Sequence, residues 1–262
     1  MKRIFLATVL AASAFAWNAI AATPPPVEAD EVVNEQMVSF YEQGAIGKTV
    51  WVIDSRPAGK FLSGHIPGAI SLPLDKLMKE PGSVDARGIP KTGKVIFYCA
   101  GRECTLSVDS AAIFRKMGYG DAWVYRNGVP GWNQKAQPLL AEEPFVKKGN
   151  LILIDTTAGK DTIVTANNKT VQLSIADLKG AKGQAALGTL SKNAPLVVVG
   201  RGDMAAVNAA MEELREMDFR RLAYFPLSAW KEALAAAPAV TTLSWAPVYG
   251  PGQVSPKVFE EA

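Results

Sequence analysis

Short runs of apolar residues recur along the chain, and segments with apolar positions at helical spacing separate them. Three such runs lie in the first half, at residues 49–53, 94–98 and 122–125, and two more follow at residues 151–155 and 195–199. Continuous apolar strands that alternate with helices are typical of a mainly parallel sheet covered on both faces. The pattern predicts an α/β fold, in which functional sites lie at the carboxyl ends of the strands.

The order of these elements repeats at a shift of about 101 residues, which indicates two copies of one unit. Residues 50–54 align with residues 151–155, and residues 94–98 align with residues 195–199. We therefore expect two α/β/α domains, each with a mainly parallel central sheet. The expected parts of the chain are a signal peptide (1–21), a proline-rich spacer (22–29), a first domain (30–137), a linker (138–149), a second domain (150–237) and a proline-rich tail (238–262).

Residues 1–21 have the organisation of a secretory signal peptide. Lys2 and Arg3 precede an apolar run from Ile4 to Trp17, and Ala19-Ile20-Ala21 has the small-x-small pattern that signal peptidase accepts. The apolar run is shorter than the roughly 20 residues that a membrane-spanning helix needs. We expect cleavage after this segment, no membrane span afterwards, and a periplasmic location, which is an oxidising compartment.

The charge balance excludes several classes of function. The chain has 28 Lys and Arg against 25 Asp and Glu, a formal net charge of +3, so we expect no nucleic acid partner. It contains two cysteines and one histidine, which cannot assemble a structural zinc site of the Cys/His type. We expect neither a metal nor another cofactor.

Cys99 is the strongest candidate for a reactive group. It follows the apolar run at residues 94–98 and begins a short loop that ends where a helix is expected to start, near Thr105. Backbone N–H groups converging at a helix N-terminus stabilise a thiolate, and they can lower the pKa of a cysteine from about 8.5 to below about 7. The pattern predicts a nucleophilic cysteine. The expected substrate-binding loop comprises Ala100, Gly101, Arg102, Glu103, Cys104 and Thr105.

The loop residues have separate expected roles. Gly101 allows a tight bend, Arg102 adds a cation able to hold an anionic substrate, and Glu103 is expected to face solvent. Thr105 is expected to cap the following helix, although its hydroxyl could instead contact a bound sulfur species.

Two alternatives for the cysteines stay open. Cys99 could be a buried, inert side chain. It could also form a disulfide with Cys104, because a separation of five positions across a curled loop can bring the two Cα atoms within about 7 Å. In that case Cys104 is a redox partner rather than part of a structural staple, since so short a closed loop constrains the unfolded chain little.

Several motifs in a fixed order resemble the rhodanese superfamily over most of residues 30–137. They are Asp54-Ser55-Arg56, Phe61 with Gly64-His65-Ile66-Pro67-Gly68-Ala69, Tyr98-Cys99, and Asn127-Gly128-Val129-Pro130-Gly131-Trp132. The resemblance implies a sulfurtransferase in which Cys99 takes a sulfane sulfur from a small donor such as thiosulfate, holds it as a persulfide, and passes it to a thiol or cyanide.

The resemblance also bears on residues outside the loop. It places His65 in a structural turn rather than in the role of a general base, and we interpret Asp54 and Arg56 as a structural pair at a strand end. Trp132 is expected to close the core.

The loop departs from the common family pattern, C-R-x-G-x-R or C-R-x-G-x-T. Ala100, Arg102 and Cys104 stand at its second, fourth and sixth places, which leaves the sulfur donor open. The related phosphatases have a longer loop and an arginine where Thr105 stands, so phosphate-ester hydrolysis is not expected.

The second copy lacks the nucleophile. Gly200-Arg201-Gly202-Asp203 stands where the cysteine loop begins in the first copy, and Ala166 matches His65. We expect a degenerate rhodanese-like domain that serves as a scaffold or as a docking surface for a periplasmic protein. Asp203 is expected to cap a helix with an apolar face, and Arg201, Arg220 and Arg221 are expected on the surface.

The alternative function is a periplasmic sulfur-binding or thiol–disulfide redox module that uses Cys99 and Cys104 without turnover of thiosulfate. A non-catalytic interaction protein is a third reading. The tail at residues 238–262 has four prolines with aromatic residues between them, and we expect it to pack into the groove between the two domains rather than bind a partner.

Overall fold

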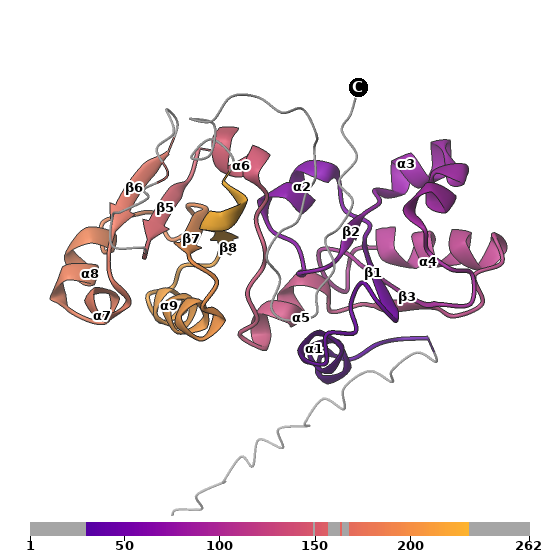
Figure 1. The fold of residues 1–262 in the computed structure, drawn as a ribbon, viewed down its shortest axis with the longest axis horizontal. Helices are drawn as coiled ribbons and strands as arrows, with labels where there is room; N and C mark the ends of the chain where they lie inside the picture. Colours follow the sequence, from indigo (N-terminus) through magenta and orange to yellow (C-terminus); the bar gives the residue numbers. More distant parts are fainter. Residues whose placement is uncertain (1–29, 149, 157–162, 164–167, 231–262) are drawn as a thin grey trace, which may run out of the picture.

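The structure, a computed structural model, describes residues 30–148, 150–156, 163 and 168–230. Within these residues the chain forms two units, each built on a four-stranded parallel sheet (Figure 1). The strands of the first sheet are β1 (Val50–Asp54), β2 (Ile70–Ser71), β3 (Lys94–Tyr98) and β4 (Ala122–Tyr125). Those of the second are β5 (Ile152–Asp155), β6 (Lys169–Gln172), β7 (Leu196–Gly200) and β8 (Leu222–Pro226).

The two sheets have the same topology. Their strand orders are β2-β1-β3-β4 and β6-β5-β7-β8, so the central pair of each sheet comes from corresponding positions of the sequence repeat. The predicted α/β class with parallel sheets is confirmed. Strands β3 and β4 coincide with the apolar runs, whereas β1 is displaced by one residue from the predicted run at residues 49–53 and includes Asp54.

Helices cover both faces of the first sheet because successive strand residues point to opposite sides. Ile96 packs with one cluster, which includes Met37 of α1 and Trp132 of α5, whereas Phe97 packs with another, which includes Phe114 of α4. The helices of this unit are α1 (Asn34–Glu42), α2 (Ala58–Ser63), α3 (Leu74–Lys79), the 3₁₀ helix η1 (Pro81–Arg87), α4 (Leu106–Lys116) and α5 (Gly128–Gln134). The fully buried Trp132 closes this core, as expected.

The second unit contains α6 (Glu143–Lys148), α7 (Ile175–Leu178), α8 (Ala181–Leu187), α9 (Met204–Glu216) and the 3₁₀ helix η2 (Leu227–Ala229). Asp203 caps α9, because its Oδ1 accepts hydrogen bonds from the amides of Ala205 and Ala206 at 3.1 and 3.2 Å. The apolar face of this helix packs in the core, as predicted.

The segment predicted to be a linker is buried over residues 138–143 and pairs with both units, which corrects that interpretation. Leu140 pairs antiparallel with His65 through two backbone hydrogen bonds of 2.8 and 3.0 Å. On its other side, the amide of Ala141 donates to Tyr224 O at 2.8 Å, and the amide of Tyr224 donates to Leu139 O at 2.7 Å. The prolines and charges of the segment suggested a linker. Its apolar residues Leu139, Leu140 and Ala141 instead form a short extended stretch that hydrogen-bonds to both units.

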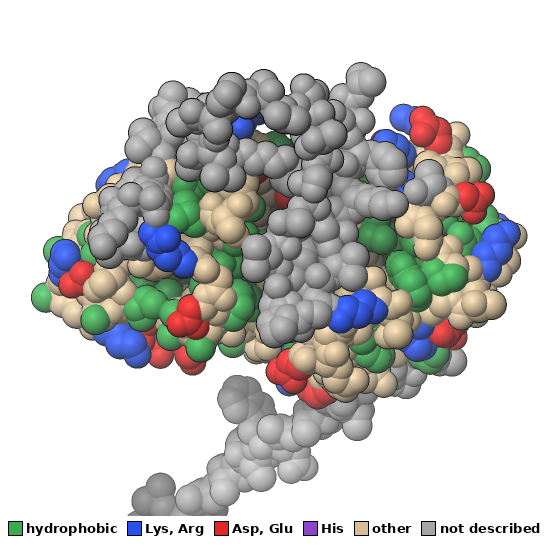
Figure 2. Space-filling view, in the orientation of Figure 1, with side chains coloured by type: hydrophobic (Ala, Val, Ile, Leu, Met, Phe, Trp, Pro, Cys, Tyr) green, Lys and Arg blue, Asp and Glu red, His purple; other side chains and the backbone are tan. Residues whose placement is uncertain are grey.

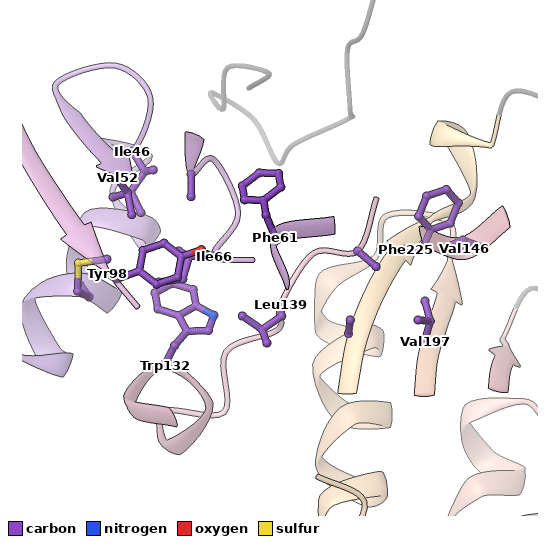
Figure 3. Packing of buried hydrophobic residues seen from close by; sticks show 14 of the residues in the cluster. Ile46, Val52, Phe61, Ile66, Tyr98, Trp132, Leu139, Val146, Val197 and Phe225 are labelled. Atoms are coloured by element: carbon purple, nitrogen blue, oxygen red, sulfur yellow. Dashed lines mark hydrogen bonds between the residues drawn. The ribbon is translucent and has the colours of Figure 1, made fainter. Parts of the chain in front are cut away.

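Apolar side chains from both units share one core around this segment. Figure 3 shows Phe61 and Leu139 lying between Trp132 of the first unit and Val197 and Phe225 of the second. All five side chains are buried. The two units are therefore joined by a packed interface rather than by the chain alone.

Several expectations lie outside the described residues: the signal peptide at residues 1–21, the spacer at 22–29, the match of Ala166 to His65, and the tail at 238–262. None of the described helices has the length and apolar character required to cross a bilayer. On the face shown in Figure 2, basic and acidic side chains lie interspersed over both units.

Candidate functional site

Cys99 lies at the carboxyl end of β3, a central strand of the first sheet. Its side chain is buried, with 1% of the residue exposed. The loop that follows reaches α4 at Leu106, and Thr105 occupies the N-cap position. The strand, loop and helix predicted around this cysteine are therefore present. The hydroxyl of Thr105 makes no capping hydrogen bond.

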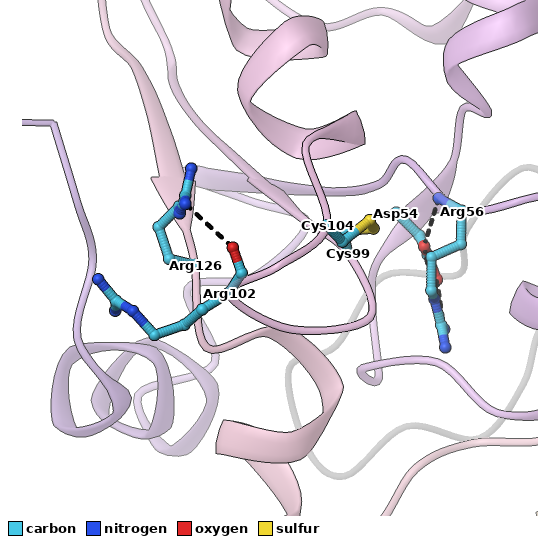
Figure 4. The surroundings of a disulfide bond; sticks show 6 residues. All are labelled: Asp54, Arg56, Cys99, Arg102, Cys104 and Arg126. Carbon is cyan, nitrogen blue, oxygen red and sulfur yellow. Dashed lines mark hydrogen bonds and ion pairs between the residues drawn. A yellow bond between two sulfur atoms is a disulfide. The ribbon is translucent and has the colours of Figure 1, made fainter.

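A disulfide joins Cys99 to Cys104, with a Cα–Cα distance of 6.2 Å (Figure 4). The loop curls so that the amide of Cys104 donates to Gly101 O at 3.0 Å. Gly101 has a φ of +139°, which L side chains rarely adopt, so it supplies the predicted bend. Cys104 is half-buried and Glu103 is exposed, the latter as expected. The structure thus contains the disulfide between Cys99 and Cys104, which was one of the alternatives that the sequence left open.

The start of α5 supports the back of the loop. The amide of Val129 donates to the carbonyl oxygen of Cys99 at 3.1 Å. Gly128 has a φ of +52°, and a β-carbon at this position would overlap Cys99 O. The motif at residues 127–132 therefore fixes the backbone of the candidate nucleophile, a role that the sequence analysis missed although the motif was visible.

Arg102 does not point toward the cysteines, which corrects the expectation that it holds an anionic substrate. Figure 4 shows its side chain directed away from the disulfide. Its guanidinium pairs with Glu31 at 2.5 Å and donates to Asn127 Oδ1 at 3.1 Å. Glu31 is 6% exposed, so a cation beside it offsets the cost of burying its carboxylate. Arg102 thus ties the loop to the segment before α1.

Arg126 is a second arginine at the loop that the sequence analysis missed. It follows β4, and its Nη2 donates to Arg102 O at 3.0 Å. Its position directly after a strand that neighbours β3 was the available signal. It supports the loop backbone from the side opposite Arg56 (Figure 4).

Asp54 and Arg56 form the buried structural pair that was expected. The Arg56 side chain donates to both carboxylate oxygens of Asp54 at 2.6 to 3.1 Å, and its Nη2 also donates to Gly64 O at 2.8 Å. Tyr98, the residue before Cys99, donates its hydroxyl to Asp54 Oδ2 at 2.7 Å. This network joins three of the sequence motifs to the end of β3.

The ionisation of this network follows from burial and from the pairing itself. Burial raises the pKa of Tyr98 well above its usual value, and the negative charge of Asp54 raises it further. Burial disfavours the charged form of Arg56, but its hydrogen bonds and charge interactions with Asp54 and Tyr98 together outweigh this and raise its pKa. The phenol therefore stays a hydrogen-bond donor and the guanidinium stays charged.

His65 has the expected structural role. Its ring is fully buried and stacks on Phe61 with 3.7 Å between ring centres. Because Phe61 O can only accept, Nδ1 carries the proton in the 3.1 Å hydrogen bond between them. Burial lowers the pKa of His65 to about 3, so the ring is neutral. Its Nε2 faces Glu142 Oε1 at 3.5 Å, and burial raises the pKa of Glu142 to about 7.

A separate cleft of about 180 Å³ lies between the two units. Its described lining includes Arg56, Lys60, Arg220 and Arg221 and does not include Cys99. Arg220 and Arg221 are exposed, as expected. Among the residues that the structure describes, no group of three or more His, Cys, Asp or Glu side chains could hold a metal ion.

Comparison with protein families identifies part of the chain. Residues 37–135 match the model of the rhodanese-like domain family. An HTH-type transcriptional regulator of Mycobacterium tuberculosis is 33% identical over 93 residues, which are 34% of this chain and 35% of the regulator. The chain thus spans about a third of the length of the curated relative that it matches.

Solved structures similar to this chain include three with identities below 25%. The 3-mercaptopyruvate sulfurtransferase SseA from Escherichia coli is 17% identical, with 77% of this chain and 98% of that chain covered and a TM-score of 0.37. The human single-domain sulfurtransferase is 22% identical, with 41% and 97% covered and a TM-score of 0.35. A protein from Bacillus halodurans is 24% identical, with 42% and 76% covered and a TM-score of 0.38.

Proposed function

We propose that this protein is a sulfurtransferase that carries a sulfane sulfur on Cys99. The observation that carries the proposal is the position of Cys99, at the carboxyl end of β3 and at the start of a curled loop before α4, inside a rhodanese-like domain. The N-terminus of an α-helix favours negative charge. A thiolate, and then a persulfide anion, at Cys99 would be stabilised there.

The cycle begins with reduction of the disulfide. Cys104 is half-buried whereas Cys99 is 1% exposed, so an external dithiol reaches the sulfur of Cys104 more readily. Its attack on Cys104 breaks the S–S bond and expels Cys99 as the thiolate. A second thiolate of the same reductant then releases Cys104 and leaves with a disulfide of its own.

Sulfur transfer then follows by two displacements. The Cys99 thiolate attacks the outer sulfur of a donor such as thiosulfate, and sulfite leaves with the electron pair of the broken S–S bond. A thiolate or cyanide attacks the outer sulfur of the resulting persulfide, and the Cys99 thiolate leaves. The burial of Cys99 favours small donors and acceptors. No step needs a metal or another cofactor.

The setting of this activity is part of the proposal. An oxidising compartment such as the periplasm, reached through the signal peptide at residues 1–21, suits a site that rests as a disulfide. We assign the second unit as a degenerate copy that acts as a scaffold or docks a periplasmic protein. Its strand order, which equals that of the first sheet, and the sequence Gly200-Arg201-Gly202-Asp203 in place of a cysteine loop support this assignment.

The disulfide also favours a second candidate, a thiol–disulfide redox module. In this function Cys99 and Cys104 exchange electrons with a dithiol partner and never carry sulfane sulfur. The reduced protein would then be inert to thiosulfate.

The experiment is intact-mass measurement of the purified protein with thiosulfate, before and after reduction and removal of the reductant, together with thiocyanate formation from cyanide. We expect the oxidised protein to take up no sulfur, and the reduced protein to form thiocyanate. The Cys99→Ser variant should form none. Failure of both the reduced protein and the Cys104→Ser variant to take up or transfer sulfur would favour the redox module.

The Cys104→Ser variant separates reduction from transfer. It cannot form the internal disulfide, so it should gain the mass of about one sulfur atom without prior reduction. Cyanide should remove that sulfur.

A further inference from the structure

We propose that Cys104 releases the sulfur held on Cys99 as sulfide, so that the internal disulfide is the product of each turnover rather than a storage form. This inference rests on the proposed function, because it begins from the Cys99 persulfide. It names the acceptor that the proposed function leaves open: the second cysteine of the same loop.

The loop is built so that the two sulfur atoms meet. The backbone curls through the hydrogen bond from the Cys104 amide to Gly101 O, and the two Cα atoms lie 6.2 Å apart. The amide of Val129 holds the carbonyl of Cys99 on one side, and Arg126 holds the carbonyl of Arg102 on the other. The disulfide itself shows that Cys104 Sγ reaches Cys99 Sγ within this frame.

The step balances without an external oxidant. The Cys104 thiolate attacks Cys99 Sγ, which is the inner sulfur of the persulfide, and a new S–S bond forms between the two cysteines. The bond between Cys99 Sγ and the sulfane sulfur breaks, and that sulfur leaves as hydrosulfide with the electron pair. Over uptake and release together, the two cysteine sulfurs go from thiols to a disulfide and give up two electrons, and the sulfane sulfur takes both and leaves as sulfide.

The burial of Cys99 favours Cys104 over an external thiol as the acceptor. Cys99 is 1% exposed, so a bulky thiol has poor access to a persulfide there, whereas Cys104 is already in the loop. Intramolecular attack by a positioned group has an effective concentration far above that of a free thiol, with values of about 10⁵ M for well-oriented pairs. The internal reaction therefore outpaces transfer to large external thiols.

The reaction class follows from this step. With thiosulfate as donor, each cycle yields sulfite and sulfide and consumes one external dithiol, which reduces the disulfide again. The protein would then act as a dithiol-dependent reductase of sulfane sulfur, and its partner would be a protein or small molecule with two thiols.

The test uses the full-length purified protein, reduced and then freed of reductant. Thiosulfate is added as the probe, sulfide is measured directly, and the mass of the protein is recorded. We expect the wild type to release about one sulfide per chain without added thiol and to become about two hydrogens lighter. The Cys104→Ser variant should keep the sulfur, with sulfide release at least about 100-fold slower. The Cys99→Ser variant should neither bind sulfur nor release sulfide.

The outcomes separate the two proposals. If Cys104→Ser gains sulfur and the wild type gains it too but releases no sulfide, this inference is wrong and the sulfurtransferase stands. If Cys104→Ser releases sulfide as fast as the wild type, Cys104 is not the acceptor. If neither protein ever gains or releases sulfur, the proposed function fails, and the inference fails with it.

Discussion

Gly128 lies against the carbonyl oxygen of Cys99 so closely that a β-carbon at residue 128 would overlap that oxygen. The φ of Gly128 is +52°, and the neighbouring amide of Val129 donates to the same carbonyl at 3.1 Å. The backbone of the candidate nucleophile is thus set by a turn that comes almost thirty residues later in the chain.

The Gly128→Ala variant tests this contact. We expect it to displace the loop of Cys99, to lower the rate of sulfur uptake by about tenfold or more, and to destabilise the fold by about 2 kcal/mol, because the clash is with backbone that cannot move aside cheaply. Uptake kinetics followed by mass, together with urea unfolding, measure the two effects. Gly88→Ala is the matched control, because Gly88 has a φ of +66° and open space around its Cβ position. It should lose stability to backbone strain but retain sulfur uptake; equal uptake defects in both variants would contradict this account.

The ion pair between Arg102 and Glu31 leads to a second prediction. Because Arg102 points away from the cysteines, Arg102→Gln should change the KM for thiosulfate by less than about twofold, while it destabilises the protein by about 1 kcal/mol by leaving the buried Glu31 carboxylate without its partner. Steady-state kinetics and urea unfolding provide both values. A double-mutant cycle with Glu31→Gln should recover part of the stability loss. A large rise in KM with unchanged stability would restore Arg102 as the residue that holds the anion.

The buried network around Asp54 leads to a third prediction. Asp54→Asn removes the charge that faces Arg56 and weakens the acceptor of the Tyr98 hydroxyl, so we expect a loss of about 3 kcal/mol in the free energy of unfolding. Asp75→Asn, at an exposed position in the first turn of α3, should cost less than about 0.5 kcal/mol. Similar losses in the two variants would show that the network contributes little.

The pair of His65 and Glu142 predicts a specific pH dependence. Burial raises the pKa of Glu142 from 4.5 to about 7, so the folded state retains a proton that the unfolded chain has lost. The stability that this contributes is present below about pH 4.5 and is lost as the pH rises through about 7. Burial lowers the pKa of His65 from 6.5 to about 3, so its contribution is present above about pH 6.5 and is lost as the pH falls toward 3. The two contributions oppose each other between about pH 4.5 and 6.5.

The Glu142→Gln variant removes one of these opposing contributions. Relative to the wild type, its free energy of unfolding should increase by on the order of 2 kcal/mol between about pH 5 and about pH 8, because the buried carboxylate no longer has to ionise. Urea unfolding at both pH values measures the change. Glu80→Gln, at an exposed position, should show no such dependence. A constant difference between Glu142→Gln and the wild type would mean that Glu142 titrates normally in the folded protein.

Although they did not include β2, β6 or β8, the repeated apolar runs predicted β1, β3, β4, β5 and β7 and the placement of Cys99 at the end of β3. This is because a buried parallel strand must be continuously apolar and must stop where polar backbone can be satisfied by a loop. The cap of α9 by Asp203 was also visible, since capping is a local interaction. The rhodanese-like motifs predicted that Asp54 and Arg56 pair and that His65 is structural.

Only the tertiary structure decided which of these groups meet. Arg102 is next to the cysteines in sequence, but a buried carboxylate 71 residues earlier draws its side chain away, and no local pattern contains that contact. Residues 138–149 have the composition of a linker, yet Leu140 pairs with His65, and its neighbours Leu139 and Ala141 bond to Tyr224. The sequence by itself determined most of the strands and the candidate nucleophile, because these depend on periodicity and on residue type. The pairings between distant residues depend on packing, which is decided only when the chain is folded.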